Sequence, residues 1–482
     1  MSPVDAAAAP VAAPPPASGT AQAQAGRTGL SGGALRRGGT FFAISQFAGM
    51  ALGFVGSTVM VRVAEPQDVA SYLLLLQAIM AVGLIMQLGL GPAALRFAPT
   101  SRGQGGDVAT ALLRSRLFRI QLTLWCVIVP PLALAWPWVA RRLDAPELAT
   151  ATPFLVGAAL LASFGHLVDN YLRAFRMYAS SALLTHLAPR ALLLGGFLAL
   201  WASAASDVPW QMLISVFLGA QLAGAIGYAL SLARTTPEET SEPRTALAPP
   251  EIRTILGATT AMGLRSAASV LFVSSDLWVL SWARPHEEVA IYGIASRVLQ
   301  VMAALPGIAN FLIPQEFAVL HADGRHKEME SLARTSSTAV AMISAASLLG
   351  ILVLGRPLLR LAFGETYVAS WAIILILAVG TFWDTASGSA GFVLQMSGHH
   401  TRLLALTAGA AVMNVGLSAA LAPVWGGHGV ALATTFTLIV LNLAMVWSAR
   451  RLVGVRTFVY FNPARWREVL RMARGDGKRR GA

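Results

Sequence analysis

Charged side chains are scarce in this sequence. Only 12% of its 482 residues are Asp, Glu, Lys or Arg, whereas 55% are hydrophobic. A soluble protein carries roughly 25% charged residues. The few charges lie in short clusters between long apolar runs. This composition excludes an ordinary soluble domain and predicts a protein that spends most of its length in a membrane.

Cysteine and phosphate-binding motifs are also missing. The single cysteine, Cys126, lies in an apolar run, so an intrachain disulfide and a cysteine-based metal site are both excluded. No Gly-Lys-Ser or Gly-Lys-Thr triplet occurs. Because the ATP-binding P-loop needs such a triplet, this loop is excluded. We expect no cofactor and no metal. Energy for any work must come from a gradient of Na⁺ or H⁺, from the membrane potential or from consumption of a product.

Twelve stretches are long and apolar enough to cross a bilayer as helices, which takes about 20 residues each. They run roughly over 40–61, 69–91, 117–140, 152–172, 180–202, 210–233, 254–282, 289–318, 336–355, 371–396, 402–422 and 428–449. The longest are expected to tilt, kink or extend beyond the bilayer. The expected fold class is an all-α polytopic membrane protein with about 12 transmembrane helices.

Lys and Arg set the orientation of such a chain, because they are retained on the cytoplasmic side. If the N-terminus is cytoplasmic, the outer loops contain only Arg62, Arg141, Arg142, Arg284, Arg356 and Arg360. Most other cations then lie inside, which predicts that both termini are cytoplasmic. The net charge of +13 is explained by topology and lipid contacts, so no nucleic acid partner is expected.

The two halves of the chain repeat each other weakly. Residues 64–72 and 283–292 share an Ala, a Pro, an acid, Val-Ala and a Tyr, and further along Pro92 aligns with Pro314 at nearly the same offset. An even number of spans separates equivalent points, so both copies insert in the same direction. This predicts two pseudo-symmetric parallel six-helix lobes around a central cavity, which is a transporter architecture.

These patterns divide the chain into five parts. Neither end of the chain has the long apolar runs of the spans. The N-terminal end is rich in Ala, Pro and Gly, and the C-terminal end is basic, with a possible interfacial helix around Trp466. The expected parts are a disordered cytoplasmic tail (1–39), an N-terminal lobe (40–233), a cytoplasmic linker (234–253), a C-terminal lobe (254–452) and a basic cytoplasmic tail (453–482). No cleavable signal peptide is expected.

Several polar residues lie inside predicted spans, where each costs about 2.5–3.5 kcal/mol if charged and so needs a reason. Arg265 and Asp276 share one helix face, Arg297 precedes Gln300 by one turn, and Gln77 occupies the repeat-equivalent place in the first half. Arginine offers a planar fork of donors that matches phosphate. Arg265, Arg297, Gln300 and Gln77 are therefore candidates for binding an anionic group.

Other intramembrane residues allow two interpretations. Arg190 is the third arginine within a span, four residues after His186, and Asp169 precedes Arg173 by one turn. They could line a site or pair within a lobe, for example Asp169 with Arg173 or Arg190. We include Arg190 among the substrate-binding candidates, and Asp276, Asp169 and Asp384 as candidates for ion or proton coupling. No residue is assigned a catalytic role.

The order of short motifs resembles a known family. The first half contains, in order, a cytoplasmic Arg36-Arg37-Gly38, a span ending in Arg62, a Pro-x-Asp loop and a span that ends with Gly89-Leu90-Gly91. The second half contains Ser275-Asp276-Leu277-Trp278 and then Phe363-Gly364. This order, over about residues 36–452, is similar to that of the Wzx-like polysaccharide flippases. These flippases form one branch of the multidrug/oligosaccharidyl-lipid/polysaccharide exporter superfamily.

The resemblance implies a function and a location. Such flippases move undecaprenyl-diphosphate-linked oligosaccharide repeat units across the bacterial inner membrane for surface or exopolysaccharide synthesis, by alternating access with a cationic central cavity. It implies the lipid-linked oligosaccharide and membrane lipids as partners, together with polysaccharide polymerase and assembly proteins. Arg265 and Arg297 are the positions that would supply the charge of the cavity.

Two alternatives remain open from the residues. A drug/cation antiporter of the same superfamily would share the architecture but would favour an acidic cavity. A membrane-embedded polysaccharide ligase or glycosyltransferase would need a catalytic loop outside the membrane, and the outer loops here are short. We expect a transporter and not an enzyme.

Overall fold

The computed structural model describes residues 32–87, 89–143, 145–175, 177–203, 207–233 and 252–460, together with Trp466. The first half is helical throughout. Its elements are α2 (Gly32–Val63), α3 (Pro66–Ile85), α4 (Leu90–Arg142), the 3₁₀ turn η1 (Pro146–Ala151), α5 (Thr152–Ala174), α6 (Tyr178–Ala182), the π turn η2 (Leu183–Leu187), α7 (Ala188–Ala202) and α8 (Trp210–Ala233).

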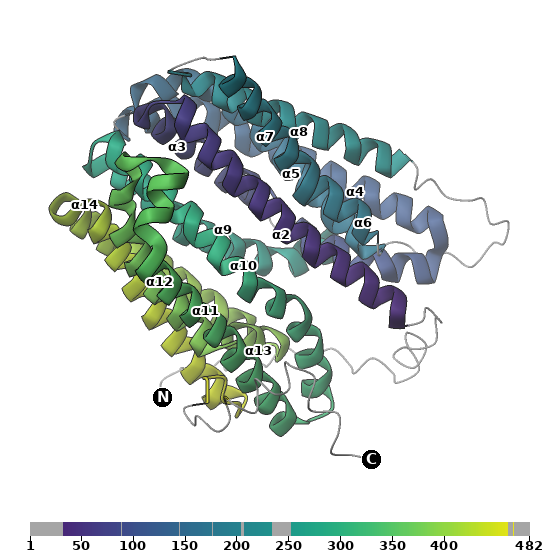
Figure 1. Ribbon diagram of the computed structural model, residues 1–482. Helices are drawn as coiled ribbons and strands as arrows, with labels where there is room; N and C mark the ends of the chain where they lie inside the picture. The colour runs from purple at the N-terminus through teal and green to yellow at the C-terminus, as the bar shows by residue number, and fades with distance from the viewer. Residues whose placement is uncertain are drawn as a thin grey trace, which may run out of the picture.

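The second half has the same character. Its elements are α9 (Ile252–Ala283), α10 (His286–Ala322), α11 (His326–Phe363), the 3₁₀ turn η3 (Glu365–Ala369), α12 (Ser370–Ser387), α13 (Ala390–Met396) and α14 (His400–Leu452). Figure 1 shows the two halves as neighbouring groups of helices, the purple-to-teal first half beside the green-to-yellow second half. The predicted all-α fold with two helical lobes is confirmed.

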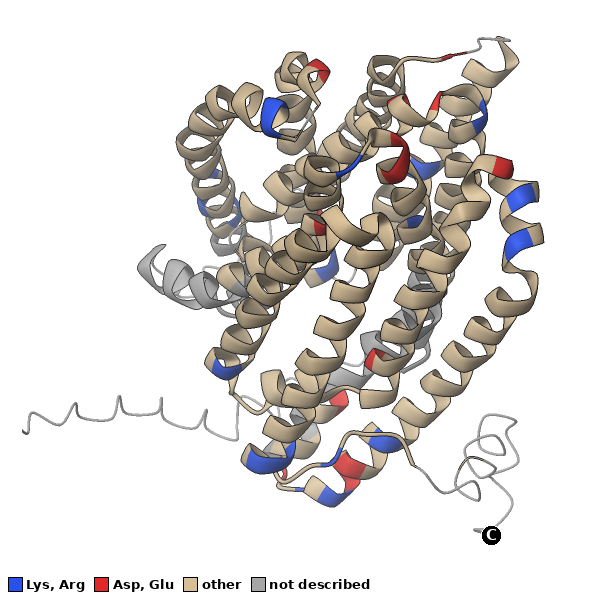
Figure 2. Ribbon diagram, turned by 90° about the vertical axis from the view of Figure 1, so that its left-hand side faces the viewer, with Lys and Arg blue, Asp and Glu red and all other residues tan. Residues whose placement is uncertain are grey.

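The helices have the lengths that a bilayer requires. Within the described residues, ten helical segments are long and apolar enough to cross a membrane. One of them, α14, bends at Gly426, whose backbone φ of 54° is not helical, so it comprises the two spans predicted at 402–422 and 428–449. Charged residues gather toward the two ends of the bundle and leave its middle largely uncharged (Figure 2), as a membrane protein requires.

The two halves open in the same way. α2 ends at Val63 and α3 begins at Pro66, while α9 ends at Ala283 and α10 begins just after Pro285. Proline suits the start of a helix because its missing N–H would have no partner there. The two lobes meet through these opening helices, since α3 packs against both α9 and α10, and α2 packs against α10.

Several boundaries differ from the prediction. α2 already begins at Gly32, ahead of the predicted start of the first span, and α4 runs without a break through the predicted loop between the second and third spans. Hydropathy marks where a helix leaves the bilayer, but the backbone hydrogen bonds continue beyond that point. Residues 1–31, the linker residues 234–251 and the tail residues 461–465 and 467–482 lie outside the described residues.

The tenth predicted span, 371–396, is broken into α12 and α13 at Gly388. The φ of Gly388 is +77°, a conformation that favours glycine. A side chain at this position would meet Ser337 Oγ and the carbonyl oxygen of Thr457. The break therefore depends on a residue without a side chain.

An extended segment after α14, residues 453–460, packs onto this break. Thr457 donates to the carbonyl oxygen of Ser387 (2.9 Å), and the Val459 N–H donates to that of Ala386 (3.0 Å). Ser337 donates to the carbonyl oxygen of Thr457 (3.0 Å). The start of the expected cytoplasmic tail is thus bound to the C-terminal lobe.

We predict that Gly388→Ala destabilises the protein by about 2 kcal/mol or more, because the added methyl group meets backbone and a positive φ is strained. Thermal melting in detergent would measure this. Gly409→Ala is the matched control, since nothing lies within 4 Å of its position inside α14, and an alanine there stabilises a helix by about 0.5–1 kcal/mol. Equal melting temperatures for both variants would contradict the account.

Candidate functional site

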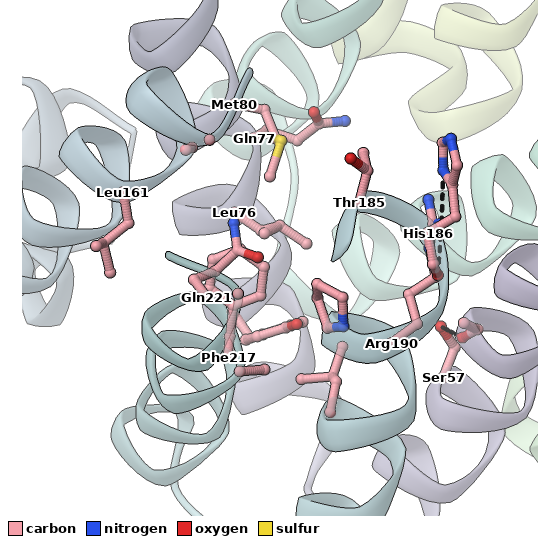
Figure 3. Close-up of a pocket in the computed structure, with 18 of the residues that line it drawn as sticks. Ser57, Leu76, Gln77, Met80, Leu161, Thr185, His186, Arg190, Phe217 and Gln221 are labelled. Atoms are coloured by element: carbon pink, nitrogen blue, oxygen red, sulfur yellow. Dashed lines mark hydrogen bonds between the residues drawn. The ribbon is translucent and has the colours of Figure 1, made fainter. Parts of the chain in front are cut away.

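A cavity of about 490 Å³ lies where the N-terminal lobe meets α9 and α10. Its walls come from α2, α3, α5, η2, α7 and α8 of the first half and from α9 and α10 of the second. Figure 3 shows labelled side chains of the cavity wall that come from the first-half elements α2, α3, α5, η2, α7 and α8. Four of the five predicted substrate-binding residues line it: Arg190, Arg297, Gln77 and Gln300.

Arg190 stands at the start of α7, just after the π turn. Its Nη1 donates to the carbonyl oxygen of His186 at 3.1 Å and lies 3.3 Å from His186 Nδ1 (Figure 3). Within the described residues, no carboxylate lies within 4 Å of its guanidinium group. Among the described residues, the positive charge of Arg190 is therefore not neutralised by a carboxylate.

Arg297 supplies the second charge of the cavity, from α10. It also has no carboxylate partner within 4 Å in the part of the chain that the structure describes. Arg190, Arg297 and Tyr72 line the same cavity. Two like charges facing one space favour an anion between them.

Gln77 and Gln300 provide neutral hydrogen-bonding groups. Gln77 reaches from α3 across the lobe boundary, where Ser274 of α9 donates to its Oε1 at 3.4 Å. Gln300 lies one turn after Arg297 and is exposed to the cavity. The two amides thus lie on either side of the boundary between the lobes.

Further polar residues line the cavity that the sequence analysis did not assign to it. They are Ser57, Tyr72, His166, Thr185, His186, Gln221, Tyr228 and Ser296. Gln221 could have been found, because it is a polar residue within the apolar run of α8. Among the described lining residues there is no Asp or Glu, so the wall combines positive charge with neutral donors and acceptors.

Arg265 falls within α9, as predicted, but its side chain lies outside the described part of the structure. Its role as a substrate-binding residue stays a prediction. Ser269, one turn further along α9, lines a different cavity of about 380 Å³ within the C-terminal lobe.

Asp169 of α5 is neutralised within its own lobe. Its carboxylate accepts from Ser181 (2.6 Å) and Thr185 (2.7 Å) and forms an ion pair of 2.5 Å with Arg173. Of the two pairings expected from the sequence, the one with Arg173 is present and the one with Arg190 is not. Asp169 therefore does not neutralise the positive charge of Arg190.

Asp276 of α9 has a different environment. It is buried and accepts hydrogen bonds from Tyr292 (2.7 Å), Asn414 (2.8 Å) and Thr434 (2.9 Å). Within the described residues no Arg, Lys or His lies within 4 Å of it. The Oδ1 atom of the same Asn414 is buried without a hydrogen-bond partner. A buried carboxylate beside an unpartnered acceptor oxygen is an arrangement that suits a cation or a proton.

Asp384 lines the C-terminal cavity together with Asn442, whose Nδ2 donates to it at 2.9 Å. Hydroxyl groups of Ser269, Ser336 and Thr407 share the lining. The three predicted coupling carboxylates thus lie in three separate environments.

The lobes are also joined directly at one end of the bundle. Arg62 at the end of α2 donates to the carbonyl oxygen of Leu361 (2.7 Å), and Ser281 near the end of α9 donates to that of Leu143 (2.5 Å). Glu147 accepts from Ser71 (3.0 Å) and lies 3.7 Å from His286 Nδ1. These contacts hold the lobes together at the end where α2 and α9 terminate.

We predict that the cavity is reachable by water. In a Cys126→Ser background, Ser296→Cys at the cavity wall should react with a hydrophilic maleimide many times faster than Ser418→Cys, because Ser418 is fully buried in α14. Labelling rates measured by mass spectrometry test this. Equal rates would mean that the cavity is closed to solvent.

The sequence matches one protein family over residues 35–315, described as "Polysaccharide biosynthesis protein". A search of curated proteins finds no match. Because the family match covers more than half of the chain, it establishes the family, and the resemblance seen in the sequence is confirmed.

Solved structures share the fold. An inward-facing multidrug resistance MATE family transporter of the MOP superfamily is 17% identical, with a TM-score of 0.69 over 84% of this chain and 95% of that one. The lipid II flippase MurJ in an inward closed conformation is 12% identical, with a TM-score of 0.68 over 89% of each chain.

A further MOP superfamily transporter, from Pyrococcus furiosus, is 16% identical, with a TM-score of 0.63 over 86% of this chain and 95% of that one. At these identities the likeness establishes the fold. The family match shows that the chain belongs to the polysaccharide biosynthesis protein family, and its multi-pass helical fold is similar to that of solved MOP superfamily transporters.

Proposed function

We propose that the protein is a flippase for undecaprenyl-diphosphate-linked oligosaccharide repeat units. It moves them from the cytoplasmic to the outer leaflet of the bacterial inner membrane, for surface or exopolysaccharide synthesis. Both termini lie in the cytoplasm, as the distribution of arginines favours. The family match to polysaccharide biosynthesis proteins and the likeness in fold to the lipid II flippase support this proposal.

The observation that carries the proposal is the pair of arginines, Arg190 and Arg297, that face one cavity without a carboxylate partner among the described residues. A diphosphate group carries several negative charges and pairs well with guanidinium groups. The neutral amides and hydroxyls around it suit sugar hydroxyls. The lipid tail needs no site, because it stays in the bilayer.

Alternating access accounts for how the headgroup crosses. In the proposed orientation, the end where Arg62, Ser281 and Glu147 join the lobes faces outward. Because these contacts join the lobes at that end, we infer that the cavity loads from the cytoplasm. Release on the outer side requires these contacts to break while the lobes rock about the cavity.

A drug/cation antiporter is the main alternative, since some structural neighbours are multidrug resistance transporters. An organic cation would need acidic groups at the cavity wall. The described wall contains arginines and histidines but no Asp or Glu. The cavity therefore favours an anionic substrate.

Asp276 is our proposed coupling group for Na⁺ or H⁺. Its carboxylate is buried without a described cationic partner, and Asn414 Oδ1 beside it is also unpartnered. Thr434 and Asn414 come from the two parts of α14 on either side of the Gly426 bend. Binding of a cation or proton here would therefore change the hydrogen bonds that Asp276 forms with both parts of that helix. Asp169 is a weaker candidate, since Arg173 already neutralises it.

We predict that Arg190→Gln and Arg297→Gln each reduce translocation of a lipid-diphosphate-linked sugar in proteoliposomes by about 10- to 100-fold, because each removes a charge-assisted hydrogen bond. Arg119→Gln is the control, since Arg119 is exposed on α4 and, among the described residues, its side chain hydrogen-bonds to Ser115 one turn earlier in the same helix. Normal transport by both cavity variants would overturn the proposal. Equal loss in all three would show a general effect of charge.

We predict that Asp276→Asn abolishes the stimulation of transport by an imposed Na⁺ or H⁺ gradient, while slow transport without a gradient persists. Asparagine keeps the size of the side chain but cannot lose or gain the charge that couples it to an ion. In the Asp384→Asn variant, which changes the C-terminal cavity, transport should still depend on the ion gradient. Transport by Asp276→Asn that still follows the gradient would rule out this coupling group.

A further inference from the structure

The π turn η2 lies directly before Arg190. The N–H of Ala188 donates to the carbonyl oxygen of Leu183, five residues back, instead of four as in an α-helix. Pro189 follows and has no N–H, so the carbonyl of Thr185 loses the donor that an α-helix would give it. The local sequence thus favours an extra residue in this turn.

An extra residue changes where the following side chains point. Each residue of a helix turns the chain by about 100°, so α7 is rotated relative to α6 by roughly that amount. Ser181 and Thr185 can then hydrogen-bond to Asp169, with Thr185 at the edge of the cavity, while Arg190, Leu193 and Phe197 line the cavity along α7. The π turn lets one continuous span serve both faces.

A hydrogen-bonded chain holds the turn in place. Thr185 Oγ1 donates to Asp169 Oδ1 at 2.7 Å and lies 2.6 Å from the hydroxyl of Tyr228 on α8. The Asp169 carboxylate is fixed in turn by Arg173 at 2.5 Å. Thr185 is therefore tied to both α5 and α8 from within the π turn.

The other side of the turn is held by α2. Gly49 packs directly against the backbone of His186, leaving no room for a side chain at that position. That same His186 carbonyl oxygen accepts from Arg190 Nη1 at 3.1 Å. The turn is thus clamped between Gly49 on one side and the Asp169–Thr185–Tyr228 chain on the other, and its carbonyl directs the guanidinium.

We propose that Thr185 is a positioning residue for Arg190: its hydrogen bonds to Asp169 and Tyr228 maintain the π turn that aims the guanidinium into the cavity. This inference rests on the proposed function, in which Arg190 binds the diphosphate. It also gives Asp169 a role in orientation through Thr185, distinct from ion coupling.

The test is a double-mutant cycle with geranylgeranyl diphosphate as the probe, bound to the full chain in detergent. Thr185→Val removes the hydroxyl but keeps the shape, and should weaken binding by about tenfold. Arg190→Gln should weaken it at least as much. The double variant should bind no worse than Arg190→Gln alone, because residues acting as one unit are not additive.

Two further variants separate positioning from general stability. Thr185→Ser keeps the hydroxyl and should restore affinity. Ser181→Ala removes another hydrogen bond to the same Asp169 carboxylate, but from before the π turn, and should lower the melting temperature without changing affinity for the diphosphate. Loss of affinity in Ser181→Ala equal to that in Thr185→Val would overturn the inference.

The remaining outcomes are also decisive. Additive losses in the double variant would mean that Thr185 contacts the ligand itself, which overturns positioning but leaves the proposed function intact. If Thr185→Val keeps full affinity while Arg190→Gln binds more weakly, the positioning role is overturned and the proposed function stays intact. A wild-type protein that binds geranylgeraniol as well as its diphosphate would overturn the cationic site, and the positioning role with it.

Discussion

The cost of placing charge in a membrane governs this structure. A guanidinium or carboxylate within the hydrocarbon layer must meet water, a partner or a donor network. The protein meets this requirement differently at each charge: Arg173 and Asp169 neutralise each other, Asp276 is surrounded by donors, and Arg190 and Arg297 face a cavity. The position of the cavity between the lobes is thus tied to where unpaired charge can be tolerated.

The two lobes share an architecture but differ in chemistry. The cavity beside the first lobe contains arginine and histidine, whereas the second lobe encloses Asp276 and Asp384 among hydroxyls and amides. In the proposed function, the duplicated scaffold separates two tasks, because the diphosphate binds at the first cavity and the coupling cation or proton binds in the second lobe. The opening helices α3, α9 and α10 connect both regions.

Much of this arrangement was visible in the sequence. Hydropathy located the spans, and the cost of buried charge singled out Arg190 and Arg297, which both line the cavity. The break at Gly388 was missed because glycine is common in membrane helices and hydropathy does not register φ. The π turn was missed because His186 and Arg190 have ordinary helical spacing. The ion pairs could not be predicted from the sequence either. The sequence allowed Asp169 to pair with Arg173 or with Arg190, and the packing of the helices determines that it pairs with Arg173.

The contacts that join the lobes at one end of the bundle have a consequence for divergence among relatives. Arg62 and Ser281 donate to the main-chain oxygens of Leu361 and Leu143, and every residue type supplies such an oxygen. Selection can therefore act on the donor alone, while the acceptor position drifts freely. Co-variation between aligned sequences would miss these two contacts, although it could detect the side-chain pair of Glu147 and His286. The closure between the lobes would thus look weaker in an alignment than it is in the molecule.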